Sequence, residues 1–536
     1  MPSRDQNAVK SDRTTLPVSQ SFDRIFVILL AVALFVVPLL TWTGLGDPTI
    51  PKTSALLFAA FLLTLVWGGR CWKREIHLVG LPWVLLPLLI LGIAAVLSLV
   101  AAVDRREALH SLVVGSLYIH LLVMIATTVR RRREIHLLLG SLLAAGVLGG
   151  LYGLLQQFGV APSSVETTTS ARMVSTFGQV NYLGGFVAYL IFPSALLFLT
   201  GGKLLQRLLS FFAFLFMIAI SILVNQMGIL LGLFAGGIVG LTLSLIARGK
   251  GRRAPRRLSI LFLCIAMMAT ATAIWRSVPD PSVDTSLPSD DVPSILSVQP
   301  LRGNSIEARV LFWAVGLRML TEHPLAGIGL GNYRSLYPSY EARVRASRNV
   351  RLFDDVRTRT EVAHNDYVQI AAEMGVGGIL GMVAFLGILG WIVWAGLHLR
   401  DPVPEWTEQT SGFLLLAAGV VTILTHALVS FPMHIPSSRL VMVGLLGLLF
   451  CPYFGMRGSL TVAVPHTARK AMVIGLVLLS ATGAVFAARD LGGVLLFSRG
   501  RRQLLLGDST AAAETLSKSV ALSFSPKCAT YYLGMA

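Results

Sequence analysis

The chain has 536 residues, of which 54% are hydrophobic and 13% are charged, and its mean hydropathy is +0.71. Soluble domains typically carry about 25% charged residues, so this composition excludes an ordinary soluble protein and indicates a membrane protein. In a soluble protein the formal net charge of +18 would suggest a nucleic-acid partner. Here the basic residues stand mostly in short clusters between apolar runs, as in cytoplasmic loops of membrane proteins, so we expect no nucleic-acid partner.

Membrane-spanning helices are the first elements that the sequence predicts. Such a helix needs about 20 mostly apolar residues, and about thirteen runs approach that length. The first run is too long for the apolar part of a cleavable signal peptide and lacks a clear cleavage site, so we interpret it as an anchor. The predicted runs are 24–42, 52–69, 80–102, 107–128, 135–158, 180–200, 206–224, 226–247, 258–275, 375–399, 410–430, 437–455 and 470–488.

The distribution of Lys and Arg predicts the orientation of these helices. Basic clusters such as Arg130 to Arg133 and the segment 248–257 alternate with loops that carry few basic residues. By the positive-inside rule the clustered loops lie in the cytoplasm, provided that the chain turns at Asn225. We therefore expect the N-terminus in the cytoplasm and the C-terminus on the opposite side of the membrane.

The same rule divides the chain into segments. Residues 1–23 form a cytoplasmic tail, 24–276 hold the first nine or so spans, 277–374 form one large periplasmic loop, 375–488 hold about four more spans, and 489–536 form a periplasmic tail. The expected fold class is an all-α polytopic membrane protein with a helical periplasmic loop and a short helical tail.

The tail from 489 to 536 differs in character from the spans. Gly507, Ala512 and Leu516, followed by Pro526 and Tyr532, resemble a little more than one tetratricopeptide repeat, with the proline about two places late. Such repeats need about three copies to bury a core. The chain therefore either ends early or is a piece of a longer protein, and we expect a protein partner to bind through this tail.

The large loop is rich in arginine and has no lysine between 277 and 374. A guanidinium group cannot be deprotonated and matches phosphate oxygens two at a time. We interpret Arg309 and Arg334, which flank recognisable motifs, as candidate anion ligands. We interpret the other group, Arg343, Arg345, Arg348 and Arg351, as solvated helix faces.

The end of the loop contains a candidate general base. Thr358 with Glu361 three residues later is a capping box, which predicts a helix that runs to Glu373 and stops at Gly375. His364 then lies in the second turn, where nearby arginines and the helix dipole disfavour imidazolium. A neutral imidazole is the form that a general base needs. The alternative is a histidine that caps or packs the helix.

Two other features carry weaker signals. Gly327, Gly329 and Gly331 superficially resemble a nucleotide-binding loop, but no strand precedes them, so we expect a tight turn after a helix that contains Arg309. The histidines inside the apolar runs, chiefly His120 and His426, are interpreted as hydrogen-bonded packing residues.

Several motifs occur in one order on this multispanning chain, and together they resemble the O-antigen ligase and polymerase superfamily of membrane glycosyltransferases over about residues 170–440. Each motif alone is weak. They are Arg172 with Ser175-Thr176-Phe177-Gly178-Gln179-Val180-Asn181-Tyr182, Arg309 four residues before Trp313, His323-Pro324-Leu325-Ala326-Gly327-Ile328-Gly329-Leu330-Gly331-Asn332-Tyr333, His364-Asn365-Asp366-Tyr367 leading to Glu373-Met374-Gly375, and Phe431-Pro432-Met433-His434-Ile435-Pro436.

The resemblance implies a GT-C-like enzyme of the bacterial inner membrane. It would transfer a glycan from an undecaprenyl-diphosphate donor to a hydroxyl of lipid A-core or another acceptor in the periplasm, with membrane lipid around it. No cofactor and no metal site is expected. By the same resemblance, Arg309 and Arg334 are catalytic diphosphate ligands and His364 is the catalytic base. Substrate-binding residues are expected at Arg172, Gln179, Asn181, Arg318, Asn365 and Tyr367.

One departure and several alternatives remain at this stage. Many relatives open the eighth span with Ser-Arg-Gly, whereas this chain has Gln226-Met227-Gly228, and Met227 cannot bind phosphate. Either Arg172 or a loop arginine replaces the missing charge, or activity is reduced. A polymerase and a protein O-oligosaccharyltransferase would have a similar sequence. The non-enzymatic alternatives are an inactive membrane scaffold and a transporter.

Overall fold

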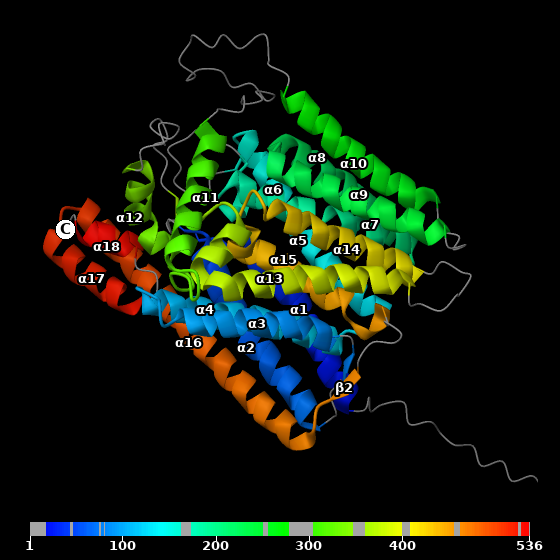
Figure 1. The fold of residues 1–536 in the computed structure, drawn as a ribbon, viewed down its shortest axis with the longest axis horizontal. Coiled ribbons are helices and arrows are strands. Elements are labelled where there is room, and N and C mark those ends of the chain that lie inside the picture. Colours follow the sequence, from blue (N-terminus) through cyan, green and yellow to red (C-terminus); the bar gives the residue numbers. More distant parts are fainter. Residues whose placement is uncertain are drawn as a thin grey trace, which may run out of the picture.

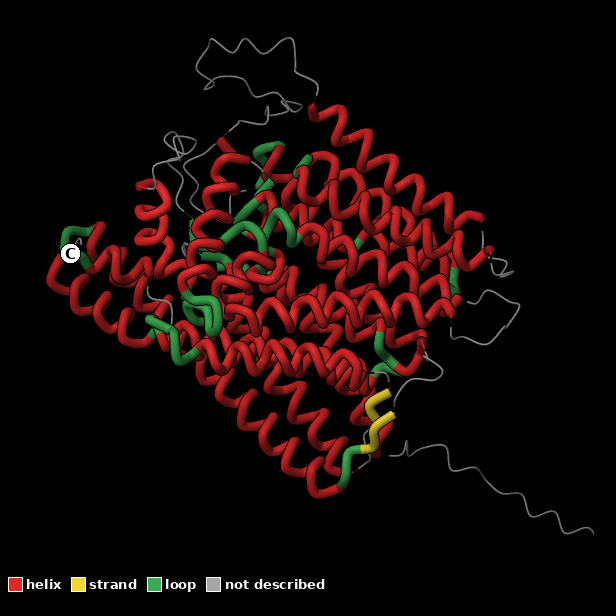
Figure 2. The backbone as a smooth tube through the Cα atoms, in the orientation of Figure 1, coloured by secondary structure: helices red, strands yellow, loops and turns green. Residues whose placement is uncertain are grey.

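A computed structural model describes residues 18–42, 47–73, 77–79, 81–161, 173–249, 256–277, 304–346, 360–398, 408–454, 461–523 and 527–534. The described residues form a bundle of packed helices (Figures 1 and 2). Eleven of these helices are long and apolar enough to cross a membrane. The expected spans at 80–102 and 437–455 correspond to shorter apolar helices, Trp83–Ser98 and Pro436–Leu449. The chain is therefore a helical, multi-pass membrane protein.

The N-terminal half contains ten helices among the described residues, and they follow the predicted runs closely. The turn predicted at Asn225 is confirmed, since this residue has a left-handed backbone (φ 45°) between two helices. The run 180–200 is divided in two at Leu190. The helices are α1 (Val18–Leu39), α2 (Thr49–Lys73), α3 (Leu81–Ser98), α4 (Arg105–Thr128), α5 (Arg132–Gln157), α6 (Val180–Tyr189), α7 (Ile191–Thr200), α8 (Leu204–Val224), α9 (Met227–Gly249) and α10 (Arg256–Ser277).

The C-terminal half differs from the expectation at its last span. Instead of a helix over 470–488 and a separate tail, one helix of 40 residues continues without a break through position 489. The elements are α11 (Asn304–Glu322), α12 (Tyr333–Ala346), α13 (Asp366–His398), α14 (Glu408–His426), α15 (Pro436–Leu449), α16 (His466–Leu505), α17 (Ser509–Leu522) and α18 (Lys527–Leu533). A short antiparallel pair of strands, β1 (His77–Val79) and β2 (Thr461–Ala463), joins two loops.

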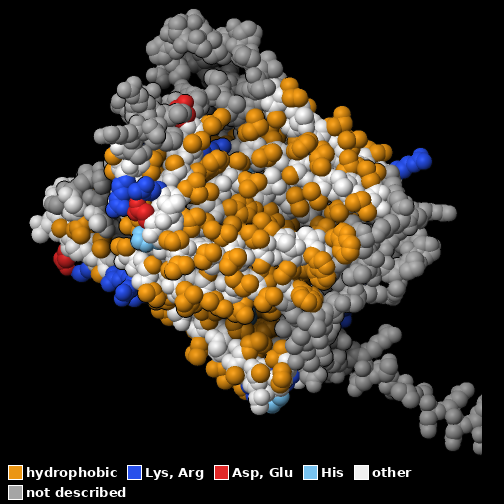
Figure 3. All heavy atoms as spheres, viewed as in Figure 1, with side chains coloured by type: hydrophobic (Ala, Val, Ile, Leu, Met, Phe, Trp, Pro, Cys, Tyr) orange, Lys and Arg blue, Asp and Glu red, His pale blue; other side chains and the backbone are white. Residues whose placement is uncertain are grey.

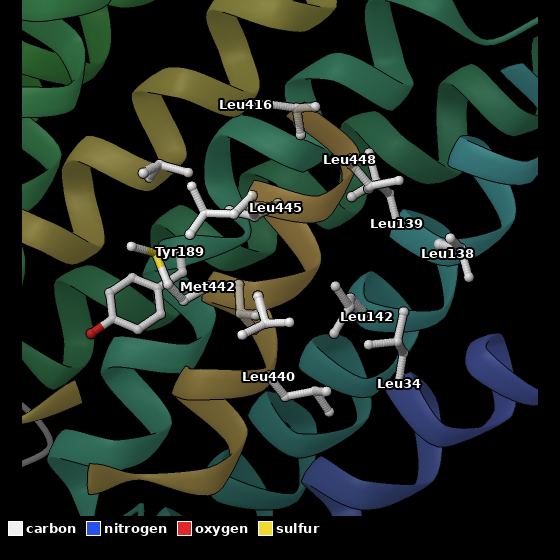
Figure 4. Close-up of a cluster of buried hydrophobic side chains, with 14 of the residues drawn as sticks. Leu34, Leu138, Leu139, Leu142, Tyr189, Leu416, Leu440, Met442, Leu445 and Leu448 are labelled. Atoms are coloured by element: carbon white, nitrogen blue, oxygen red, sulfur yellow. The ribbon is translucent and has the colours of Figure 1, made fainter. Parts of the chain in front are cut away.

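The centre of the bundle is a cluster of buried leucines from α1, α5, α14 and α15 (Figure 4). Glycines bring neighbouring helices close: a Cβ atom at Gly236 of α9 would overlap Thr422 and the backbone of Ala418 on α14. Small residues of this kind allow close backbone approach between membrane helices. On the outside, large apolar side chains such as Leu89 and Val383 are exposed, and apolar atoms cover the broad middle of the surface in Figure 3. This is the surface expected of a chain surrounded by lipid.

A small second core stands at one end of the bundle. Helices α11 and α12, the turn between them and residues 360–365 surround a cluster that includes Phe312, Tyr333 and Ala363. We call the described residues 304–346 and 360–365 the cap. In Figure 1 the cap lies at the same end of the bundle as α17 and α18, whereas β2 lies toward the other end. Charged side chains gather at the cap end in Figure 3.

Candidate active site at the start of helix α13

The glycine segment forms the tight turn that the sequence predicts. Gly327, Gly329 and Gly331 have φ values of 68°, 100° and 74°, a backbone region in which side chains are strained. A Cβ atom at Gly327 would overlap the backbone of Glu373, and one at Gly329 would overlap Ala102 of the α3–α4 connection. The glycines are therefore required for the turn to lie directly against the bundle.

A buried pair of polar side chains on α13 holds this turn. Glu373 accepts hydrogen bonds from Gly331 N (2.8 Å) and Tyr333 N (3.3 Å), and Gln369 Nε2 donates to the same carboxylate at 3.0 Å. Gln369 Oε1 in turn accepts from Ala363 N at 3.0 Å. One buried network thus positions the backbone directly before Arg334 and directly before His364.

The helix that follows His364 begins later than predicted. The capping box expected at Thr358 and Glu361 is wrong as a helix start, because α13 begins at Asp366. The actual cap is Asn365, whose Oδ1 accepts from Tyr367 N (3.0 Å) and Val368 N (3.1 Å). Thr360 instead bonds locally to Val362, in a turn that precedes the helix. The predicted stop is confirmed as a break, since Gly375 is non-helical inside α13.

His364 therefore precedes the helix, and its backbone is strained. Its φ of 52° is rare for a residue with a side chain and requires support from its surroundings. The imidazole stacks on Phe312 with ring centres 5.5 Å apart, and it meets Phe431 edge-on at 4.6 Å. The ring is thus fixed between an aromatic residue of the cap and one from the α14–α15 connection.

His364 is held in its neutral form, as expected. Burial, and secondarily the guanidinium of Arg309, lower the pKa of His364 from 6.5 to about 4. The expected cause was different, since arginines and a helix dipole were predicted to act, whereas burial between two aromatic rings dominates. At neutral pH the imidazole can accept a hydrogen bond or a proton.

Of the two arginines that are catalytic candidates, Arg309 lies near this histidine and Arg334 contacts Glu361, three residues before it. Arg309, on α11, is half-buried and lies within electrostatic reach of His364 and His426. Arg334, in the first turn of α12, is 27% exposed and has its Nε 3.7 Å from Glu361 Oε1. The cap thus carries one guanidinium near each end of the short segment 361–364.

His426, which we interpreted as a packing residue, also borders this group. Its Nδ1 lies 2.5 Å from the hydroxyl of Tyr189, so the two side chains share a hydrogen bond. Glycines on two helices, Gly185 of α6 and Gly228 of α9, leave room for the ring. Position 227, where many relatives have arginine, therefore stands beside His426.

Several buried polar atoms near this place have no hydrogen-bond partner among the described residues. They include His426 Nε2, Asn225 Oδ1 and Gln226 Oε1, the last two directly before α9, and Trp313 Nε1, one turn beyond Arg309 on α11. Buried polar atoms are costly when unpaired, and nearly all are satisfied in proteins. Such a group is expected where a polar ligand supplies the missing partners.

A third histidine pairs with a carboxylate at the start of α13. His434 Nδ1 lies 2.8 Å from Asp366 Oδ1, and Met433 N donates to Asp366 Oδ2 at 2.9 Å. Asp366 N also donates to Ala427 O at 3.0 Å, which joins α13 to the end of α14. The α14–α15 connection is therefore fixed to the residue two places after His364.

The remaining predicted substrate-binding residues have different surroundings. Asn365 caps α13, and the hydroxyl of Tyr367 donates to Leu424 O at 2.8 Å, so both have structural contacts. Arg318 lies nine residues, about two and a half helical turns, beyond Arg309, which puts it on the opposite side of α11. There it pairs with Glu322 at 2.7 Å.

Three more predicted substrate-binding residues lie elsewhere or outside the description. Gln179 is exposed and directly precedes α6, and Asn181 is half-buried in the first turn of that helix. Arg172 falls outside the described residues. Among the residues that the structure describes, no group of His, Cys, Asp and Glu is placed to hold a metal ion.

Three polar residues of α13 were assigned no role from the sequence, although their spacing forms a recognisable pattern. Asp366, Gln369 and Glu373 follow one another at intervals of three and four, which places them on one face of an otherwise apolar helix. Polar residues in membrane helices are rare and commonly functional. The pairing of Asp366 with His434 gave no such signal, because the two are 68 positions apart.

Part of the chain matches a known protein family. The family model described as O-antigen ligase matches residues 212–386, a range that begins in α8, ends in α13 and includes Arg309, Arg334 and His364. No curated protein gives a match. This match confirms the resemblance seen in the sequence motifs: residues 212–386 are similar to the O-antigen ligase family.

Proposed function

We propose that the protein transfers a glycan from an undecaprenyl-diphosphate carrier to a hydroxyl group of an acceptor. The observation that carries this proposal is a cap in which Arg309 lies near an uncharged His364 and Arg334 contacts Glu361, three residues before it. The family supports glycan transfer of the ligase or polymerase type. The unpaired polar atoms beside α9 support a polar substrate at the same place.

The arginines would act on the leaving group. When the bond between the sugar and the diphosphate breaks, negative charge grows on the diphosphate, and fixed positive charge stabilises it. Arg309 and Arg334 provide that charge from α11 and α12. Because the backbone before Arg334 is bound to buried Glu373, the start of α12, which carries this arginine, is fixed before substrate binds.

His364 would act on the acceptor. Its neutral ring accepts a hydrogen bond from the acceptor hydroxyl, and the proton begins to move toward the ring as the oxygen attacks the sugar. Stacking on Phe312 and contact with Phe431 keep the imidazole in one orientation. The strained backbone at position 364 fits a residue whose placement matters more than its local stability.

We place this chemistry on the periplasmic side of the inner membrane. The basic clusters favour a cytoplasmic N-terminus and a periplasmic loop 277–374. The common position of the cap, α17 and α18 at one end of the bundle supports the same side for the loop and the tail (Figure 1). The tail, with its small core of Phe497, Ala512 and Leu516, is a candidate surface for a protein partner.

Reconstitution tests the proposed function. Purified protein in lipid nanodiscs should move a labelled glycan from synthetic undecaprenyl diphosphate to lipid A-core, to a second glycan chain or to a protein hydroxyl, releasing one undecaprenyl diphosphate per transfer. The acceptor that is used separates a ligase, a polymerase and a protein O-oligosaccharyltransferase. A folded protein that consumes no donor with any acceptor would contradict the proposal.

A further inference from the structure

Asp366 and His434 form a polar pair that the proposed function does not use. The Asp366 side chain is 2% exposed, whereas the His434 side chain is 31% exposed. Both oxygens of the carboxylate are engaged, one by His434 Nδ1 and one by Met433 N. The carboxylate is thus fixed and shielded, while the imidazole that it holds can be reached from outside.

This arrangement makes His434 a proton acceptor. Because a carboxylate accepts hydrogen bonds, the geometry assigns the ring proton to Nδ1 and leaves the lone pair on Nε2. A histidine that is oriented by a carboxylate in this way is a recurrent device for proton transfer in enzymes.

The surroundings of His364 differ from those of His434, because no carboxylate among the described residues holds its ring. Two aromatic rings and Arg309 disfavour its protonated form, and the pKa of His364 is about 4. At neutral pH such a ring returns a proton at once. The proton of the attacking hydroxyl therefore does not stay on His364, and it has to pass on to a second base or to water.

The two histidines belong to one structural unit. The ring of Phe431 touches His364, and the carbonyl oxygen of Phe431 accepts a hydrogen bond from His434 N at 3.0 Å. From the other direction, Asp366 is two residues after His364 and binds His434 directly. Both connections are short and involve buried or half-buried groups.

We propose that His434 is a further proton acceptor of the transfer reaction and that Asp366 positions it, an inference that rests on the proposed function. The acceptor oxygen forms a bond to the anomeric carbon while the bond from that carbon to the diphosphate breaks. The leaving undecaprenyl diphosphate keeps the electron pair of the broken bond. The hydroxyl proton, which moves toward His364 as the oxygen attacks, passes on to Nε2 of His434 and then to water.

Other charged or titratable groups also act on His434. On α13, the Glu373 carboxylate lies within electrostatic reach of the ring, in addition to Asp366. On α15, Arg439 donates to Met433 O, next to His434, and stacks over Tyr118 of α4. His364 borders the same connection through Phe431. Asp366 is the group among these that contacts the imidazole directly.

The test compares variants of the reconstituted protein across pH. His434→Gln keeps a donor for Asp366 but cannot take up a proton, so transfer should be about 10²-fold slower with an unchanged KM for donor. In Asp366→Asn the ring loses the carboxylate that orients it, so transfer should be slower and the pH dependence of the rate should change. His323→Gln is the matched control, because His323 is an exposed cap histidine that contacts Tyr340, and its rate and profile should stay unchanged.

A chemical rescue covers the case in which Asp366→Asn does not fold. In His434→Ala, added imidazole should restore part of the lost rate, since the site is reachable from outside. A folded His434→Gln with the rate and pH profile of the wild type would overturn the inference. So would a slow His434→Ala that imidazole does not restore and whose pH profile is unchanged, since that indicates a structural role. A wild-type protein that binds donor but transfers nothing would instead refute the proposed function, and this inference with it.

Discussion

The membrane bundle and the cap are held together by different kinds of interaction. In the bundle, buried leucines such as Leu142 and close approaches at glycines such as Gly236 account for most of the contacts. In the cap, backbone N–H groups donate buried hydrogen bonds to Glu373 and Gln369 of α13, and His364 adopts a strained conformation. Apolar packing tolerates small displacements, whereas hydrogen bonds require distances within a few tenths of an ångström. The more demanding interactions thus lie beside the groups that need accurate placement.

The prediction with the largest expected effect concerns the side of the membrane on which the cap and the tail lie. Reporter proteins fused at Pro293, in the loop before the cap, and at Gly507, in the tail, should be active only as periplasmic reporters. A fusion within the basic cluster 248–257 serves as the control and should be active only in the cytoplasm. Cytoplasmic activity at Pro293 would contradict the location proposed for the site.

Loss of the imidazole should be the most damaging single change in the cap. His364→Ala should fold and bind lipid-linked donor but transfer at least about 10²-fold more slowly, the effect typical of a lost acid–base group. The measurement is the initial rate per folded molecule in nanodiscs.

A bundle variant provides the contrast. Leu142→Ala removes a fully buried leucine and should lower stability by about 2–5 kcal/mol without changing turnover per folded molecule. If His364→Ala behaved in the same way, with normal turnover and reduced stability, His364 would be a packing residue.

The arginines should have a smaller effect than the histidine. A charged hydrogen bond contributes about 1.5–3 kcal/mol, so Arg309→Ala and Arg334→Ala should each lose roughly 10- to 150-fold in transfer. Lysine at either position should restore only part of the rate, because it lacks the planar fork. Full activity of both lysine variants would show that positive charge matters but its geometry does not.

Acidification should weaken the cap through His364. The folded protein holds the pKa of His364 at about 4, against an ordinary 6.5, so between these values only the unfolded chain binds the proton. Stability therefore falls as pH decreases from 6.5 to 4. In His364→Gln this contribution is absent, and the melting temperature should fall less over the same range. Equal slopes in both proteins would indicate that His364 is not held neutral.

The smallest expected effect is at the border between the two regions. Met227 begins α9 next to Gly228, which packs on His426, so Met227→Arg would add a charge close to the site. Transfer should be preserved or modestly raised, and donor KM should fall. Leu231→Arg, one turn further along α9, is the control and should not lower KM. A folded Met227→Arg with unchanged rate and unchanged KM would place the donor away from α9.

The sequence predicted most of the bundle and part of the site. Long apolar runs specify helices directly, and the turn at Asn225 followed from the distribution of charge. The glycine turn was also predictable, because three glycines in five residues are unfavourable in a helix. The start of α13 was not, since Thr358 and Asn365 both precede the helix and either is a good cap. The contact of Asp366 with His434 depends on how the start of α13 lies against the α14–α15 connection, which local patterns do not contain.

The unbroken helix α16 has a mechanical consequence. Its 40 residues span about 60 Å, roughly twice the hydrocarbon thickness of a bilayer. Contact of the Asp490 carboxylate of α16 with the His110 imidazole of α4 (3.2 Å) joins it to the bundle, and α17 folds back against its last turns at Gly500. The tail is therefore attached to the bundle by a continuous helix and not by a flexible linker. A protein partner that binds the tail, as proposed above, would be held at one height and one angle to the membrane. Its local concentration would then not depend on the length of a flexible linker.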